Sequence, residues 1–312
     1  MGTGPEADDS ETAAADPATT AGGPSTEPEV ARPLHTPLFR AQHEDRYLRQ
    51  SLIKTYEENY DCRLVVLIDQ ITDTSITLFT ELLHDVDDSS DLHLMLWSPG
   101  GDGEVAVRLA RMAQAACRRF VVVVPEMAKS AATILALGAH EVLMGPTSDL
   151  GPIDPQVYLP DRGFVSAKDL IASVDRAIAE VEQRPSTYPL MAAMLAGIDV
   201  TAVEFARSAL NRTGDMARQA IASNPERNGI AVKDMLDRIN GPLIKEPSSH
   251  GAVIGAPEAK TFGLPITDLG HANPQWRDIW ALWTRYFVLG PTPYLQVYEG
   301  IRASQVKVFE GR

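Results

Sequence analysis

The chain has 312 residues, and 44% of them are hydrophobic, which is enough for a large domain with a core of its own. The formal net charge is −14. Such an acidic chain is a poor match for nucleic acid, because phosphates bind to basic surfaces. Residues 1–34 hold seven acids and one base, so this short segment contributes −6 of the total.

The amino-terminal segment shows neither the basic region nor the apolar region of a secretory signal, and no apolar run reaches the length of a membrane span. The two cysteines, Cys62 and Cys117, indicate reduced structural thiols rather than a disulfide framework. We therefore expect a soluble cytoplasmic protein without an integral membrane segment. Peripheral association with a membrane stays open.

The first segment, residues 1–34, consists mostly of Ala, Thr, Pro, Gly, Asp and Glu, and we expect it to be a disordered acidic tail. Residues 35–60 are charged and have helical spacing. Their apolar face is Ala41, Leu48, Leu52 and Tyr56.

Strand and helix patterns then alternate. Apolar strands are predicted at 63–68, 92–97, 120–124 and 141–144, and helices between or after them at 76–86, 103–118 and 129–139. Continuous apolar strands that alternate with helices are typical of a parallel sheet covered on both faces. The predicted fold class is therefore α/β, with a mainly parallel sheet followed by carboxy-terminal helices.

After residue 155 the pattern is mostly helical. Helical spacing occurs at 167–182, 187–197, 201–211, 215–223, 231–239, 257–262 and 275–289. Asn273 is the predicted N-cap of the last helix, with Pro274 in its first position. We expect three parts: the tail (1–34), the main domain (35–272), and a carboxy-terminal helix and tail (273–312) that is a candidate oligomer contact.

Ser130 stands between the apolar strand 120–124 and a helix of small residues. A serine at such a corner projects its hydroxyl from the end of a sheet, and the N–H of the next residue points toward whatever binds there. The plain alternative is a serine that only caps the helix. A second corner, residues 98–103, ends the preceding strand. The pair of corners favours an acyl-transfer site with a nucleophile and an oxyanion hole.

The corner at residues 98–103 reads SPGGDG. From Gly101 on it fits a loose dinucleotide-binding fingerprint, and Glu126 stands where a ribose-binding acid would be expected. Asp102 argues against a nucleotide, because its charge would meet the pyrophosphate. Two other uses remain: an exposed backbone N–H at Gly101, which lacks a Cβ, or a tight turn with Asp102 as the helix cap.

Several short motifs follow one another in a fixed order. They are TPLF at 36–39, YLR at 47–49, SPGGD at 98–102, AKSA at 128–131, LGA at 137–139, MGP at 144–146, LGPIDPQ at 150–156, and a later segment from His250 to Leu264. This ordered set resembles the serine dehydrogenase proteinase family. Its members are relatives of the Clp proteolytic subunit and of signal peptide peptidase A, within the Clp/crotonase superfamily. The resemblance covers about residues 36–270.

The resemblance implies an ATP-independent serine peptidase. It places Ser130 as the nucleophile and the backbone N–H groups of Gly101 and Ala131 in the oxyanion hole. The Clp subunit has its His about one strand after the serine, where this chain reads GPIDP. Signal peptide peptidases use a lysine on a later helix instead. Lys168, 38 residues after Ser130, is the candidate by order and context.

The basic residues near these motifs have alternatives. Lys168 would act as a base if burial lowered its pKa, or it is an exposed lysine at a helix start. For Lys129 a solvated side chain is favoured over a contact with the oxyanion region or an acid. We expect His140 to serve the end of the nucleophile helix. His250 either reaches the site or makes structural hydrogen bonds. No metal-ligand spacing is seen, and no cofactor is expected.

Trp276, Trp280, Trp283 and Phe287 form one stripe at helical spacing. Core packing is one explanation and a subunit interface is the other, because aromatic residues are enriched at interfaces. The resemblance favours the interface, since relatives assemble into rings or stacked oligomers. We therefore expect a homo-oligomer.

The predicted function is a serine peptidase that cleaves peptides or unfolded protein, with a Ser–Lys dyad as the implied catalytic pair. A crotonase-type acyl-CoA enzyme is one alternative, because it shares the backbone oxyanion hole but uses Glu carboxylates. A catalytically silent assembly or binding module, which kept the fold and lost the base, is the other. The fold alone does not decide among them.

Overall fold

The computed structural model describes residues 1, 36–159, 163–245 and 251–309. Most of the predicted tail therefore lies outside the described residues. The chain divides into two units, residues 1–42 and 43–312, and the second holds the sheet and the candidate site.

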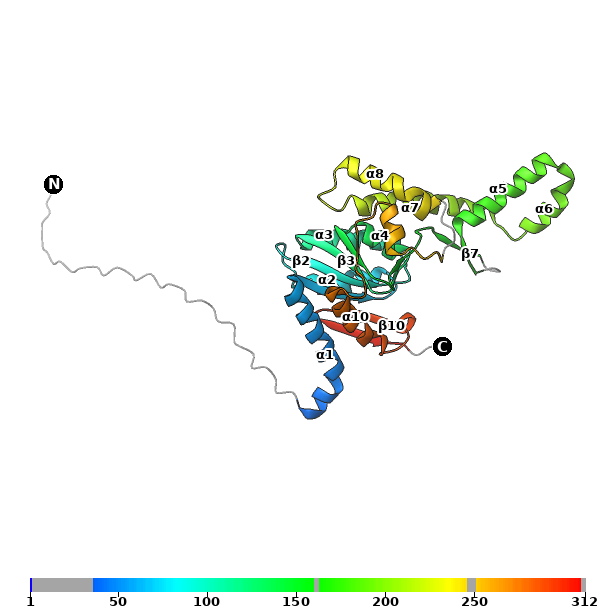
Figure 1. Ribbon diagram of the computed structural model, residues 1–312. Helices are drawn as coiled ribbons and strands as arrows, with labels where there is room; N and C mark the ends of the chain where they lie inside the picture. The colour runs from blue at the N-terminus through cyan, green and yellow to red at the C-terminus, as the bar shows by residue number, and fades with distance from the viewer. Residues whose placement is uncertain (2–35, 160–162, 246–250, 310–312) are drawn as a thin grey trace, which may run out of the picture. The chain divides into compact units, whose positions relative to one another are not determined.

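A seven-stranded sheet forms the centre of the second unit (Figure 1). Its strands are β1 (Cys62–Ile68), β2 (Asp91–Trp97), β3 (Arg119–Val124), β5 (Glu141–Met144), β9 (Ile266–Asp268), β10 (Leu295–Glu299) and β11 (Ser304–Val308). The spatial order is β11-β10-β1-β2-β3-β5-β9. The strands from β1 to β9 pair in parallel, whereas β10 pairs antiparallel with both β1 and β11. This confirms the predicted α/β class with a mainly parallel sheet.

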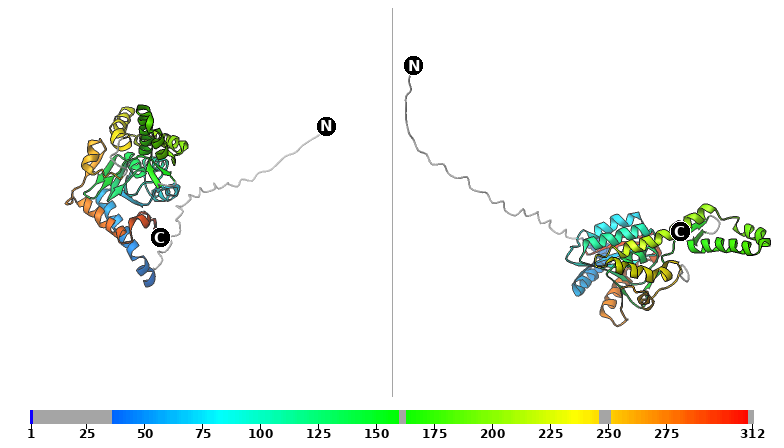
Figure 2. Two further views of the ribbon diagram at one scale, coloured as in Figure 1. Left: turned by 90° about the vertical axis from the view of Figure 1, so that its right-hand side faces the viewer. Right: turned by 90° about the horizontal axis from the view of Figure 1, so that it is seen from above.

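Helices cover both faces of the sheet (Figures 1 and 2). One face carries α2 (Asp73–Leu83), α3 (Gly103–Ala116) and α4 (Ala131–Leu137), and the other carries α1 (Pro37–Tyr60) and α10 (Pro274–Phe287). Successive side chains of β1 alternate between two cores: Val65 packs with α2 and α3, while Leu64 and Val66 pack with α1 and α10. This period of two is the reason that the central strands read as continuous apolar runs.

Helix starts follow the cap residues in the sequence. Asp102 Oδ1 accepts hydrogen bonds from the N–H groups of Glu104 at 2.8 Å and Val105 at 3.2 Å, at the start of α3. Asn273 caps α10 in the same way, with Pro274 as its first residue, as predicted. Each cap satisfies N–H groups that have no partner within the helix.

The carboxy-terminal segment contributes two strands as well as a helix. The sequence led us to expect a tail after α10, but β10 and β11 extend the central sheet beside β1. The buried carboxylate of Glu299 fixes this addition. It accepts hydrogen bonds from Arg49 at 2.7 and 3.2 Å, from Tyr286 at 2.7 Å and from Ser304 at 2.6 Å. A buried charge that is fully paired in this way ties α1, α10 and the strand pair together.

A helical arm and several helices follow the central strands. They are α5 (Ala167–Gln183), the 3₁₀ turn η1 (Pro185–Thr187), α6 (Tyr188–Leu195), α7 (Val200–Ile221), α8 (Gly229–Ile239), the π-helical turn η2 (Asn240–Lys245), α9 (Ala256–Thr261) and the 3₁₀ turn η3 (Thr292–Tyr294). The helices α5 and α6 project from the body of the second unit and form the arm (Figure 2). Two predicted helices, 201–211 and 215–223, form the single helix α7, and the hairpin β7 (Gln156–Leu159) and β8 (Gly163–Ser166) was not predicted.

None of the described helices is by itself long and apolar enough to cross a membrane. Residues 185–195 and 200–221 meet the length and composition for a span only when taken together, and the two are bent by 82°.

The aromatic stripe of α10 is divided between two environments. Trp276 and Trp283 are 3% and 2% exposed and belong to the core, whereas Trp280 and Phe287 are 39% and 59% exposed. Core packing therefore explains Trp276 and Trp283, and the subunit interface stays a prediction for the exposed pair, Trp280 and Phe287. Both cysteines are free and buried, as expected for structural thiols.

We predict that acid destabilises this fold through His93. Burial lowers the pKa of His93 to about 4, and its Nδ1 lies 2.9 Å from the hydroxyl of Tyr56. In the unfolded chain the pKa of a histidine is about 6.5, so between pH 6.5 and 4 only the unfolded state binds this proton. The free energy of unfolding therefore falls by about 3 kcal/mol as the pH falls from 7 to 4.

Urea unfolding of the parent and of His93→Gln at pH 7, 5.5 and 4.5 measures this effect. The free energy of unfolding of the variant should fall less steeply with acid, while His84→Gln, at an exposed site, should follow the parent. Equal slopes for the parent and His93→Gln would refute the assignment.

Candidate functional site

A second, small set of strand pairings carries the candidate site. β4 (Met127–Ala128) pairs in parallel with β6 (Asp149–Leu150). Ser98 forms a bridge with Ala128 on the outer side of β4, and Ile254 forms one with Leu150 on the outer side of β6. The segments that follow β2, β3 and β5 are therefore held side by side, although β2, β3 and β5 belong to the large sheet.

The glycine turn after β2 lies directly against the Ser130 turn. Gly100 has a φ of +113°, and a Cβ added to it would stand 2.8 Å from the Cβ of Ser130. Gly101 has a φ of +136°, and its added Cβ would stand 2.1 Å from the carbonyl oxygen of Ile71. Both positions therefore require glycine, by backbone conformation and by space.

Ser130 has the geometry of a strained corner. Its φ is 50° and its ψ is −113°, and its side chain makes no capping hydrogen bond to α4. Only two non-glycine residues in the described part of the chain have a positive φ, and Ser130 is one of them. Such a conformation costs on the order of 1–3 kcal/mol and collects at functional sites. The interpretation of Ser130 as a simple helix cap is therefore wrong.

Two backbone N–H groups beside Ser130 are available to a ligand. Ile71 donates to the carbonyl of Gly100 at 2.8 Å and accepts from the N–H of Asp102 at 2.9 Å. In a parallel pairing of this kind the intervening residue, Gly101, directs its own N–H to the opposite side. Among the residues that the structure describes, neither this N–H nor that of Ala131 has a protein acceptor.

The structure does not favour a nucleotide-binding site at this corner. The carboxylate of Asp102 is engaged as the cap of α3, which was the plain interpretation of this motif. Glu126 accepts a hydrogen bond from the indole N–H of Trp97 at 2.9 Å. Across the described ranges, no group of three or more His, Cys, Asp and Glu side chains is arranged to hold a metal ion.

The basic residues near Ser130 fall in different places. Lys129 is not solvated as expected, because its ammonium pairs with Asp149 at 2.6 Å. Lys168 is half-buried as the second residue of α5. Its pairing with Ser130 in a dyad stays a prediction. His250 lies outside the described residues.

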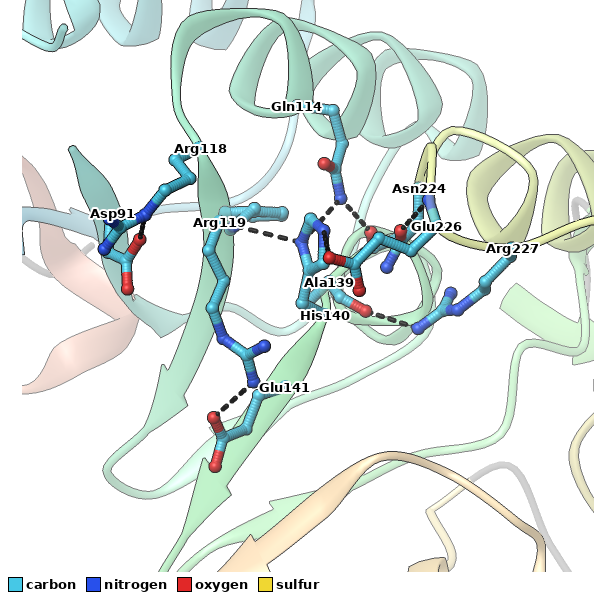
Figure 3. A network of polar contacts seen from close by, with 12 residues as sticks. Asp91, Gln114, Arg118, Arg119, Ala139, His140, Glu141, Asn224, Glu226 and Arg227 are labelled. Atoms are coloured by element: carbon cyan, nitrogen blue, oxygen red, sulfur yellow. Dashed lines mark hydrogen bonds and ion pairs between the residues drawn. The ribbon is translucent and has the colours of Figure 1, made fainter. Parts of the chain in front are cut away.

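The far end of α4 is held by a polar network (Figure 3). Arg227 donates to the carbonyl oxygens of Leu137, at 2.6 Å, and Ala139, and Gln114 donates to that of Gly138 at 2.6 Å. Cations and donors at this end satisfy the last carbonyls of a helix. Burial lowers the pKa of Arg227 to about 10.

His140 is part of this network, because its Nδ1 lies 3.4 Å from Nε2 of Gln114, the same amide that donates to Gly138. Its Nδ1 accepts from the backbone N–H of Phe120 at 3.1 Å, so the ring joins the start of β3 to the end of α4. Because Nδ1 is the acceptor, the neutral ring carries its proton on Nε2. Burial lowers the pKa of His140, in keeping with that neutral form.

Two buried residues in the motifs around Ser130 were not singled out by the sequence analysis. The hydroxyl oxygen of Thr133 lies 2.7 Å from the carbonyl oxygen of Ala128 and 2.9 Å from that of Gly151, so its one O–H bond has two acceptors within reach. Asp154 is only 2% exposed and follows this loop. The sequence could have pointed to these residues only through their positions. Thr133 follows Ser130 by one helical turn, and Asp154 lies in the segment where the Clp subunit would have its His.

A surface cavity of about 420 Å³ lies elsewhere. Lys54, Arg63 and Arg118 are among its lining residues. It stands at the amino ends of β1, β2 and β3, opposite the edge that carries Ser130. These three cations pair with Glu58, Glu57 and Asp91, respectively.

Comparison with known proteins supports the resemblance seen in the sequence. Residues 67–177 match the family described as ClpP-like SDH-type serine proteinase. This range includes both corners and Lys168. An uncharacterized protein of Methanocaldococcus jannaschii is 30% identical over 89 residues, which are 28% of this chain and 29% of that relative. The alignment thus covers less than a third of either protein.

We predict that Gly100→Ala deforms the site. The new Cβ would meet Ser130 and would impose a side chain at a φ of +113°, so we expect a loss of roughly 1–3 kcal/mol in the free energy of unfolding. Urea unfolding measures the loss.

Gly214→Ala is the matched control. Gly214 lies inside α7, and an added Cβ would have no atom within 4 Å. This substitution should stabilise the protein by about 0.5–1 kcal/mol, because alanine is the better helix former. A Gly100→Ala protein as stable as its parent would show that the two turns do not touch.

Proposed function

We propose that the chain is a serine peptidase with Ser130 as its nucleophile, because residues 67–177 match the family described as ClpP-like SDH-type serine proteinase. The observation that carries this proposal is the corner itself. Ser130 is held at a positive φ without a capping bond, and it lies against a glycine turn in which the N–H of Gly101 has no acceptor among the described residues.

In the proposed reaction Oγ of Ser130 attacks the carbonyl carbon of a peptide bond. The negative charge that develops on the carbonyl oxygen would be met by the N–H groups of Gly101 and Ala131, and loss of one such donor typically costs about 3 kcal/mol in the barrier. The base that takes the Oγ proton returns it to the leaving amine. Water then hydrolyses the acyl-enzyme and frees Ser130.

Lys168 is the proposed base. Its order after Ser130 matches the later helix of the signal peptide peptidases, and it is half-buried near the start of α5. The preceding residue, Ala167, donates to the carbonyl of Pro155 at 2.9 Å, which joins α5 to the loop after β6. Lys129 is unsuited to the role, because Asp149 and two carbonyl groups already take its three N–H bonds.

The proposed substrates are peptides or unfolded protein, without a need for ATP. The family resemblance supports this substrate class. The N–H of Gly101, which has no acceptor among the described residues, could receive the carbonyl oxygen of such a substrate.

Fluorophosphonate labelling followed by mass spectrometry tests the nucleophile. We expect the label on Ser130 and none after Ser130→Ala. Lys168→Met should slow the labelling by roughly 10²- to 10⁴-fold, the usual contribution of a general base. Lys233→Met, at a 74% exposed lysine of α8, should label at the parental rate.

The alternatives give different results. A folded protein that is not labelled would overturn the peptidase proposal and favour a silent assembly or binding module. Labelling that survives Lys168→Met would dismiss that lysine, and His250→Ala would then be measured. Saturable binding of an acyl-CoA without peptide cleavage would favour the crotonase-type enzyme.

We also propose that the protein forms a homo-oligomer through its arm. The helix α6 has no buried residue, and Tyr188, Leu190 and Met194 are 64%, 59% and 59% exposed. Exposed apolar groups gathered on a projecting element are typical of protein interfaces. Assembly of the relatives makes a second copy of this chain the proposed partner.

Light scattering coupled to gel filtration measures the assembly. The parent should elute with a mass that is a multiple of the single chain, and the double variant Leu190→Glu/Met194→Glu should shift toward a single chain. Ile230→Glu, at a 74% exposed position of α8, should not change the mass. A single-chain mass for the parent, or an unchanged mass for the double variant, would contradict this interface.

A further inference from the structure

Lys129, the residue before the proposed nucleophile, has all of its donors engaged. Its Nζ donates to Oδ2 of Asp149 at 2.6 Å, to the carbonyl of Leu150 at 3.2 Å and to the carbonyl of Ala252 at 3.1 Å. An ammonium group has three N–H bonds, so this set is complete. The three acceptors belong to two segments, β6 and the chain just before Ile254.

The Lys129 side chain is shielded from solvent and closely packed against the loop after β6. Lys129 and Asp149 are 18% and 16% exposed, so the ion pair is largely shielded from solvent. A Cβ added to Gly151 would stand 2.4 Å from Cδ of Lys129. The lysine therefore crosses directly over the loop after β6, and position 151 has room only for a hydrogen.

We propose that Lys129 is a positioning residue of the Ser130 site. It holds the Ser130 turn against β6 and against the segment 252–254, and so fixes where Oγ of Ser130 and the N–H of Ala131 stand. This inference rests on the proposed function, because it assigns Lys129 a purpose in placing that nucleophile. Lys129 does not touch the substrate in this account.

The bonds around the turn show why one side chain has this influence. On one side, the backbone N–H of Lys129 donates to the carbonyl of Ser98 at 3.0 Å. On the other side, the Lys129 ammonium and the Thr133 hydroxyl both reach the β6 segment, at Leu150 and Gly151. A strained turn persists only when its surroundings over-determine it. Loss of the ammonium removes three of these constraints at once.

The ion pair also determines which variant is informative. Oδ1 of Asp149 is buried without a hydrogen-bond partner among the described residues, and burial raises the pKa of this carboxyl. Lys129→Met alone would leave an uncompensated buried charge, which can unfold the protein. The double variant Lys129→Met/Asp149→Leu removes both charges and keeps apolar volume, so it is the variant to compare with the parent.

The experiment combines hydrogen exchange with fluorophosphonate labelling. In the double variant the amides of Lys129 and Ala132, which donate to Ser98 and Lys129, respectively, should exchange at least about tenfold faster than in the parent. Amides of β1 and β2 should not change. The maximal labelling rate, kinact, should fall roughly 10- to 100-fold with little change in probe affinity, as expected for a displaced nucleophile.

Arg227→Met is the matched control. It also removes a partly buried cation that binds backbone carbonyls, but at the opposite end of α4. Its thermal stability should fall while kinact at Ser130 stays near that of the parent. If kinact fell only because the protein was less stable, it would fall in both variants alike. The comparison therefore separates a positioning role from a general loss of stability.

The outcomes are separable. Exchange at Lys129 and Ala132 that stays within about twofold of the parent would overturn the positioning role, whatever the labelling shows. Faster exchange with an unchanged kinact would overturn it as well. If the parent itself is not labelled, the proposed function fails, and the exchange result still decides whether Lys129 holds the turn.

Discussion

Two backbone hydrogen bonds of Ser98 determine where the groups of the candidate site lie. Its N–H donates to the carbonyl of Met127 at 3.1 Å, and its carbonyl accepts from the N–H of Lys129 at 3.0 Å. The chain after β2 is thereby paired with the chain after β3, and the two turns that follow are forced into contact. This contact is the reason for glycine at position 100, and it brings Ser130 beside an outward-facing N–H of the same turn.

The strain at Ser130 is maintained from both ends of its helix. At the near end, backbone pairing and the Lys129 and Thr133 side chains hold the turn. At the far end, Arg227 and Gln114 satisfy the last carbonyls of α4. A seven-residue helix has little stability of its own, so these side chains and the surrounding core fix its position. An unusual backbone conformation kept by so many contacts supports a functional explanation.

The sequence predicted those features that depend on local pattern. The parallel strands followed from apolar runs, Asn273 from its capping chemistry, and the two corners from glycine and small residues. Features that depend on distant partners were missed. The pairing of Arg49 with Glu299 joins residues 250 positions apart, and it fixes the strands in place of the expected tail. Lys129 was expected in solvent because most lysines are exposed, and only the fold brings Asp149 within 2.6 Å of it.

A crystal structure of the protein after reaction with a peptide boronic acid tests the central claim most directly, because the boron adopts the tetrahedral geometry of the reaction intermediate. The account predicts a bond from boron to Oγ of Ser130, with one boronate oxygen within hydrogen-bond distance of the N–H groups of both Gly101 and Ala131. An adduct whose oxygens all point away from these two groups, or a protein that forms no adduct at Ser130, would contradict it.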